Sequence, residues 1–135
     1  IDAGVLGETL ETAHSYTAIG ELYDGVRAAL ERATGGGVVM CHVSHAYRDG
    51  ASLYFTFLAA ARRGGEIAQW REIKGEACAA IVAGGGTITH HHAGGRDHAP
   101  YMAAEVGELG LDVIRAAKER LDPAGVMNPG KLLPS

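Results

Sequence analysis

The residues best suited to chemistry in this chain are histidines, and four of the seven lie between Gly84 and His98. Imidazole titrates near neutral pH, so it binds anions, moves protons and ligates metals. The same stretch holds five glycines, which let a backbone turn or approach a ligand where a Cβ would clash. A purification tag or a solvated loop has a similar composition, but this run is short and internal. The stretch therefore predicts a functional site centred on His90, His91 and His92.

Three kinds of chemistry are open to these histidines. If Thr87–His92 is extended, His90 and His92 share one face and His91 points the other way, so the imidazoles converge only where the strand ends within the triplet. Zinc needs a third or fourth ligand and supporting hydrogen bonds. No cysteine or acidic residue stands at a recognisable spacing, so we expect no metal. Binding of a substrate phosphate with proton transfer, and structural hydrogen bonding, both stay open.

A tyrosine is the second candidate for chemistry. In the β-rich run 51–59, alternation puts Leu53, Phe55 and Phe57 on one face, which predicts the core, and Tyr54 on the other face. Tyr54 is then either a catalytic group on a rigid strand or an amphipathic tyrosine at the sheet surface. The alternation alone does not decide between the two.

The partner of Tyr54 depends on a predicted hairpin. The Asp49–Gly50 pair separates the β-rich run 38–46 from the strand that carries Tyr54, and such a pair is typical of a hairpin turn. A two-residue loop places Tyr54 opposite His45, and a three-residue loop places it opposite Ser44. The sequence leaves both registers open.

The remaining elements follow from apolar periodicity and from glycine and proline signals. We expect an extended segment over 5–16, a helix from a cap at Thr17 to the glycines at 35–37, a helix over 66–83, the extended histidine segment, and a helix from Pro100 to Leu121. The predicted core-facing stripes are Ile67, Trp70, Ile73, Ala77 and Ile81 in the second helix, and Met102, Val106, Leu109, Val113, Ala117 and Leu121 in the third. This order predicts an α+β fold in which an antiparallel sheet carries helices mainly on one face, related to the ferredoxin-like arrangement.

Composition narrows the class of protein. A chain of 135 residues, 47% hydrophobic and 21% charged, suits one globular domain. A net charge of −4 without a basic cluster argues against a nucleic-acid partner, and no apolar run is long enough for a membrane span. Cys41 and Cys78 are expected to be reduced core thiols. The first residue is Ile1 and not Met, so we expect a piece of a longer polypeptide.

Four segments together resemble a known family. They are His-Val-Ser-His-Ala-Tyr at 42–47, Gly-Ala-Ser-Leu-Tyr-Phe-Thr-Phe at 50–57, the glycine and histidine stretch at 85–98, and Leu-Asp-Pro-Ala-Gly-Val-Met-Asn-Pro-Gly-Lys-Leu at 121–132. They resemble the C-terminal part of the alkyldihydroxyacetone-phosphate synthases, which belong to the vanillyl-alcohol-oxidase-like FAD family. The Asn-Pro-Gly-Lys ending is shared with FAD-linked lactate and glycolate dehydrogenases. The triple histidine discriminates, since those dehydrogenases typically carry Gly-Glu-His there.

The resemblance implies a domain arrangement and a reaction. Residues 1–121 would form the substrate (cap) domain, incomplete at its N-terminus, and residues 122–135 a closing segment that returns to the flavin domain, which would lie upstream. The reaction exchanges the acyl group of acyl-dihydroxyacetone phosphate for a long-chain fatty alcohol, with no net redox change. An FAD-linked oxidase or dehydrogenase of 2-hydroxy acids is the alternative. A non-catalytic binding module is a third reading.

The resemblance also assigns residues and partners. Tyr54 matches the family's proton-transfer tyrosine, and His90, His91 and His92 match its active-site histidines. Asn128 and Lys131 fall in the segment that returns to FAD. Composition and the missing Ser-Lys-Leu ending favour a bacterial cytoplasmic homologue. A homodimer and peripheral membrane contact of the full-length enzyme are left open.

Overall fold

The chain forms two compact units, Ile1–His90 and His91–Ser135. The computed structural model describes residues 4–133, so the last two residues of the predicted closing segment lie outside the described residues. Within the described part, no helix combines the length and the apolar character needed to cross a membrane.

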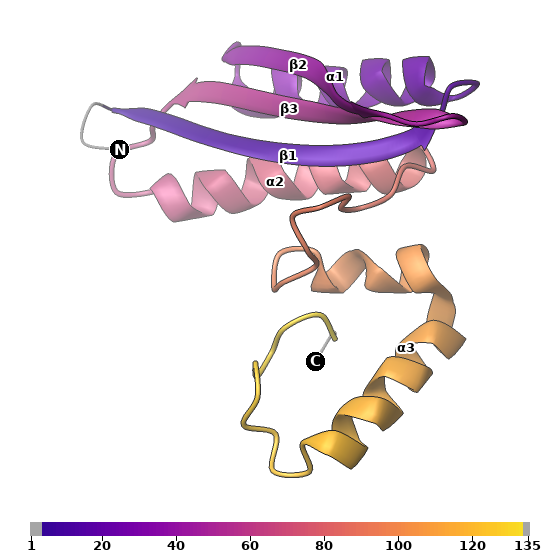
Figure 1. Cartoon of the computed structure of the whole chain (residues 1–135). Helices are drawn as coiled ribbons and strands as arrows, with labels where there is room; N and C mark the ends of the chain where they lie inside the picture. The colour runs from indigo at the N-terminus through magenta and orange to yellow at the C-terminus, as the bar shows by residue number, and fades with distance from the viewer. Residues whose placement is uncertain (1–3, 134–135) are drawn as a thin grey trace. The chain divides into compact units, whose positions relative to one another are not determined.

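A three-stranded antiparallel sheet forms the centre of the first unit. Its strands are β1 (Val5–Ser15), β2 (Val38–Ala46) and β3 (Gly50–Ala60), arranged in the order β1-β3-β2. Strand β3 therefore has a hydrogen-bonded neighbour on both sides, as Figure 1 shows. The predicted alternation on β3 is confirmed, because Phe55 and Phe57 are fully buried.

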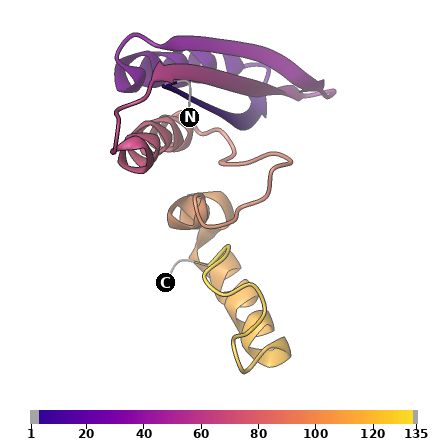
Figure 2. The same ribbon diagram turned by 90° about the vertical axis from the view of Figure 1, so that its left-hand side faces the viewer.

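Helices α1 (Ile19–Thr34) and α2 (Glu66–Ala83) cover one face of this sheet (Figures 1 and 2). Tyr23 of α1 stacks on Phe55, with 5.9 Å between ring centroids. The helix side chains that complete the core are Leu22, Val26, Ala29, Leu30, Ile73, Ala77, Cys78 and Ile81. Burial of this apolar area is the main driving force for the unit, and the α+β expectation is confirmed.

Among residues 4–90, no helix covers the opposite face of the sheet. Val38, Met40 and Leu58 are 56%, 47% and 39% exposed there. Side chains on this face alternate with those of the core along each strand. Tyr54 lies on this open face.

The hairpin forms where the sequence predicts it, but both predicted registers are wrong. The Tyr47 N–H donates to the Gly50 carbonyl at 2.8 Å. The two loop residues are therefore Arg48 and Asp49, and Gly50 already belongs to β3. A register shift between Val43 and His45 then moves the pairing by one more residue. A glycine is needed at position 50 because β1 approaches closely there: a Cβ would lie 2.2 Å from the His14 carbonyl oxygen.

The expected histidine strand is absent from the described residues. Thr87–His92 has no strand assignment, although the Thr87 N–H donates to the Ala13 carbonyl on the edge of β1 at 3.1 Å. A fourth strand of a ferredoxin-like fold would pair along this edge. After this bond, side chains of β1 hold the segment in place of strand pairing: the Thr12 hydroxyl donates to the Thr87 carbonyl at 2.8 Å.

Some helix details also differ from expectation. Helix α1 begins after Ala18 without a side-chain cap, and the predicted cap Thr17 bonds the Ser15 hydroxyl instead at 2.9 Å. Ile67 was expected in the core of α2 but is 61% exposed. Gln69 is buried in the same helix, because its amide bonds the backbone of the β3–α2 connection at both Ala60 and Arg62.

The second unit contains the short 3₁₀ helix η1 (Ala99–Tyr101) and α3 (Met102–Leu121), followed by the closing segment. The apolar stripe predicted for α3 is wrong after Met102, which is buried, because the other five predicted residues are exposed: Val106, Leu109, Val113, Ala117 and Leu121. Gly107 has φ 73° and ψ 164° inside the helix. This break changes the direction in which later residues point, so a single helical period does not describe the buried side.

Candidate active site

Three polar side chains form a row across the open face of the sheet. Tyr54 on the central strand β3 pairs with Glu11 on β1 and with His42 on β2. Directly opposed residues in antiparallel strands place their side chains on the same face. The His42 and Tyr54 rings stack with 5.2 Å between centroids and 26° between planes. The structure therefore holds the predicted phenol on a rigid element beside a buried carboxylate and an imidazole.

Glu11 connects this row to the first residue of the histidine triplet. Its Oε1 accepts the His90 backbone N–H at 3.0 Å, and its Oε2 lies 3.8 Å from His90 Nδ1. Glu11 is only 2% exposed. A carboxylate is costly to bury without hydrogen bonds and compensating charge, and the backbone N–H of His90 supplies one such hydrogen bond. The segment after Thr87 is thus tied to the sheet through a side chain.

A second tyrosine reaches the other side of the same imidazole. The Tyr47 hydroxyl lies 2.9 Å from His90 Nε2. The His45 ring lies close to His90 as well, with 5.2 Å between centroids and 53° between planes. His90 is therefore held at its backbone and contacted at Nε2, which fixes the direction of the ring.

The other two histidines of the triplet belong to the second unit. His91 and His92 are exposed and lie edge to face, with 4.6 Å between ring centroids. The next residue, Ala93, has a left-handed φ of 67°, which an L-residue adopts at some cost. His98 is buried, and its Nδ1 lies 3.2 Å from the Ala93 carbonyl. The fourth histidine of the stretch therefore has a structural hydrogen bond that holds this turn.

The closing segment lies beside the same turn within the second unit. The Leu132 N–H donates to the Gly95 carbonyl at 2.8 Å, and a Cβ on Gly94 would be 2.8 Å from a Leu132 methyl. This contact brings Asn128 and Lys131, the two predicted cofactor residues, onto a segment that is bonded to the histidine turn. Close approach explains a glycine at 94.

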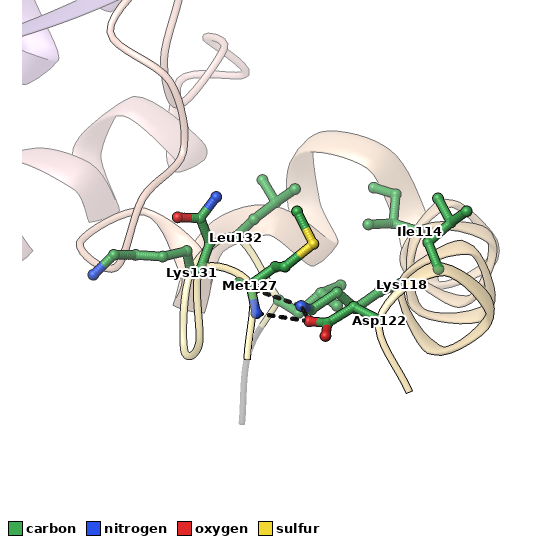
Figure 3. A pocket seen from close by; sticks show the side chains of 9 residues that line it. Ile114, Lys118, Asp122, Met127, Lys131 and Leu132 are labelled. Atoms are coloured by element: carbon green, nitrogen blue, oxygen red, sulfur yellow. Dashed lines mark hydrogen bonds and ion pairs between the residues drawn. The ribbon is translucent and has the colours of Figure 1, made fainter. Parts of the chain in front are cut away.

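A cavity of about 310 Å³ opens between α3 and the closing segment. Figure 3 shows the ion pair between Lys118 and Asp122, with Lys131 extending away from it. The Asp122 carboxylate also accepts the backbone N–H groups of Val126 and Met127 at 3.1 and 2.9 Å. Hydrogen bonds from Lys118 and then from the Met127 backbone lower the pKa of Asp122. The lining residues are Ile114, Lys118, Leu121, Asp122, Met127, Asn128, Lys131, Leu132 and Leu133.

The mix of side chains in this cavity fits part of a flavin. Isoleucine and leucine side chains provide apolar walls, and Asn128 and Lys131 provide a polar end. Cofactor sites commonly combine apolar walls with a few placed polar groups. Asn128 and Lys131 would contact the polar edge of the group, where a positive charge tunes a flavin.

The sequence did not single out Glu11 or Tyr47. Glu11 lies in a stretch without firm alternation, so its face could not be assigned before the pairing with Tyr54 was known. Tyr47 lies in the hairpin connection and reaches His90 only because the histidine segment leaves the sheet. One signal was present: Glu11 lies within the expected extended segment 5–16, and Tyr47 directly follows the expected strand 38–46.

Cys41 is not a further nucleophile of this site. Burial raises the pKa of its thiol to about 11, so the reactive thiolate is scarce at neutral pH. Both cysteines are free thiols; Cys78 lies in the core as expected, whereas Cys41 is only partly buried.

A family match identifies this chain as a flavoenzyme domain. The family described as FAD linked oxidases, C-terminal domain, matches residues 1–132, and the chain belongs to that family. The cofactor of these enzymes is FAD.

Named relatives are more specific. The chain is 42% identical over 95 residues to an alkyldihydroxyacetonephosphate synthase of Trypanosoma brucei brucei, a match that covers 70% of this chain and 16% of the relative. The enzyme of the same name from Caenorhabditis elegans is 33% identical over 96% of this chain and 23% of its own length. The chain thus spans less than a quarter of these relatives.

Structural comparison agrees on the fold. A solved alkyldihydroxyacetonephosphate synthase superposes with a TM-score of 0.63 at 23% identity, over 95% of this chain and 21% of that protein.

A relative with a different name is also similar in sequence. A glycolate oxidase subunit, GlcD of Bacillus subtilis, is 30% identical over 83% of this chain and 23% of the relative.

Proposed function

We propose that this chain is the substrate-domain part of an FAD-dependent alkyldihydroxyacetone-phosphate synthase. The reaction replaces the acyl group of acyl-dihydroxyacetone phosphate with a long-chain fatty alcohol and forms an ether bond. One observation carries the proposal: the histidine triplet begins at His90, and Glu11 ties His90 to the sheet position next to Tyr54. The names of two relatives, 42% and 33% identical to this chain, support the same reaction.

The proposed roles follow from the chemistry of each side chain. Tyr54 donates or accepts the proton that the exchange requires, since a phenol on a rigid strand keeps its position during the reaction. His91 and His92 bind the substrate phosphate, and His90, whose ring nitrogens face Glu11 and Tyr47, takes part in proton transfer. The exposure of His91 and His92 leaves their ring nitrogens accessible to an anionic group.

FAD supplies the covalent chemistry at the substrate carbon when it is bound. In this proposal Asn128 and Lys131 contact its polar edge, and most other contacts come from a flavin domain upstream of this chain. The isolated 135-residue chain should therefore not bind FAD at micromolar affinity. A titration followed by flavin fluorescence checks this, and stoichiometric quenching would place the flavin site within this chain.

The alternative is an FAD-linked oxidase of 2-hydroxy acids, which the similarity to the glycolate oxidase subunit favours. The two readings differ in whether electrons leave the substrate. A polypeptide containing this chain and its flavin domain should be incubated with acyl-dihydroxyacetone phosphate and hexadecanol, and separately with glycolate or lactate and a dye acceptor. An alkyl product without dye reduction supports the synthase. Dye reduction by the 2-hydroxy acid, without alkyl product, rejects it.

A further inference from the structure

We propose that Glu11 and Tyr47 are positioning residues that set the orientation and tautomer of His90. The three residues form a continuous chain from a buried carboxylate, through the imidazole, to a phenol at the surface. The catalytic consequence of this chain rests on the proposed function. Its geometry does not.

The carboxylate fixes one end of the chain. Glu11 is almost fully buried, and its two oxygens address different atoms of one residue: Oε1 bonds the His90 backbone N–H, and Oε2 faces Nδ1 at 3.8 Å. A negative charge beside Nδ1 favours the tautomer with the proton on that nitrogen. Nε2 then carries the lone pair and accepts a hydrogen bond.

Tyr47 supplies the donor for that lone pair. Its hydroxyl lies 2.9 Å from Nε2, so the phenol O–H donates to the imidazole in this tautomer. The Tyr47 backbone is fixed from both sides, because its N–H donates to Gly50 and its carbonyl accepts the Tyr16 hydroxyl at 3.0 Å. The His45 ring runs nearly parallel to the Tyr47 ring, at 9° and 6.4 Å.

The phenol end of the chain is accessible. Tyr47 is 53% exposed and lines a shallow cavity of about 350 Å³ in the first unit. The buried end lies in the cross-sheet row with Tyr54. Glu11 is therefore adjacent both to the proposed proton-transfer tyrosine and to the first histidine of the triplet. A change at Glu11 should disturb both.

The first test reads the tautomer directly in the 135-residue chain. Two-bond ¹H–¹⁵N NMR spectra distinguish a protonated Nδ1 from a protonated Nε2 in the neutral ring of His90. We expect the Nδ1–H form in the wild type, and a smaller share of it in Glu11→Gln and Tyr47→Phe. A wild-type His90 ring protonated at Nε2, or variants with unchanged tautomer populations, would overturn the proposed arrangement of Glu11, His90 and Tyr47.

The second test reads the consequence for the reaction in the flavin-containing polypeptide. Glu11→Gln keeps the shape and an oxygen for the His90 N–H but removes the charge, and Tyr47→Phe removes only the hydroxyl. Each should lower kcat by about 10- to 100-fold, as is typical when the partner of a functional imidazole is lost. The pH dependence of kcat should also move, which a purely structural role would not cause.

Matched controls separate these effects from general damage. Glu8→Gln makes the same change three positions earlier on β1, where the carboxylate accepts from the Trp70 indole at 2.8 Å. Tyr23→Phe makes the same change on α1. Both should leave the pH profile unchanged. If the pH profile of kcat were the same in all four variants, the positioning role would be excluded. This holds whichever substrate the protein uses, because the profile can be measured with acyl-dihydroxyacetone phosphate or with a 2-hydroxy acid. The NMR result stands apart from the identity of the reaction.

Discussion

The carboxylate of Glu11 accepts the backbone N–H of His90 at 3.0 Å, across 79 positions of sequence. This bond fixes where the histidine triplet begins relative to the sheet. An irregular segment would otherwise need strand pairing to hold its position. Here the buried side chains of Glu11 and Thr12 perform that task and leave the triplet free of the alternation that a strand imposes.

Tyr54→Phe tests the proposed proton transfer. The change keeps the ring that stacks on His42, so folding and FAD content should be nearly unchanged. The rate of acyl-to-alkyl exchange should fall by at least about 100-fold, the lower range for loss of a general acid or base. Product formation is measured in the flavin-containing polypeptide. Tyr23→Phe on α1 is the matched control, and a Tyr54→Phe rate above half of wild type would leave Tyr54 as a sheet-surface tyrosine.

Gly86→Ala tests the close approach that starts the histidine segment. A Cβ at this position would lie 2.5 Å from the Thr12 hydroxyl and 2.7 Å from a Leu22 methyl, and both neighbours are buried. Overpacking of this kind should lower the free energy of unfolding by about 1–3 kcal/mol. Gly25→Ala on α1 is the control: it meets no atom within 4 Å and should raise stability by about 0.4–1 kcal/mol. Urea denaturation measures both. Equal stability of the two variants would contradict the close contact.

Cys41 should react slowly with thiol reagents in the native chain. Its pKa of about 11 leaves on the order of one thiol in a thousand ionised at pH 8. Cys78 is 1% exposed and is protected by burial. Ellman's reagent at pH 8 should therefore modify neither cysteine rapidly until denaturant is added. Prompt native reaction of one thiol would show that Cys41 is more exposed to water than the structure indicates.

Acid should release the closing segment through Asp122. The pKa of this carboxyl is lowered below its ordinary value of 3.8, first by the hydrogen bond from Lys118. A lowered folded-state pKa stabilises the native form above the unfolded pKa, and this contribution disappears as pH falls through the lowered value. The Val126 and Met127 amides should thus stay protected from hydrogen exchange near neutral pH, where the Asp122 carboxylate is charged, and exchange faster in strong acid, after correction for intrinsic rates.

Two variants make that acid effect specific. Asp122→Asn removes the ion pair with Lys118, so the amides of the segment should already exchange faster at neutral pH. Asp112→Asn removes an exposed ion pair with Arg115 on the same helix and should have no such effect. Protection that does not change in Asp122→Asn would show that the segment is held by other contacts.

Most elements of the fold were predictable because their signals are local. Alternation located Phe55 and Phe57 in the core, and Gly35 ends α1 in the left-handed conformation expected of a glycine stop. The histidine segment was expected to be a strand because Ile and Thr precede it. Its conformation depends instead on Thr12 and Glu11 of β1, residues far away in the sequence.

The candidate site was less predictable than the fold. Tyr54 could be placed on the open face, but its partner His42 could not, since the register includes a shift between Val43 and His45. A shift of one residue changes every opposed pair, and no residue type marks it in the sequence. The roles of His91, His92, Asn128 and Lys131 stay predictions.

Strand β1 serves the core and the proposed site at alternate positions. Leu10 and Thr12 are buried beneath the helices, while Glu11 between them faces the site. Substitutions at Glu11 can therefore be designed without changing a helix-facing side chain. An insertion or deletion of one residue has no such freedom, because it would exchange the two faces of the strand from that point on. Sequence drift in this domain should accordingly be less tolerant of a change in the length of β1 than of a single replacement within it.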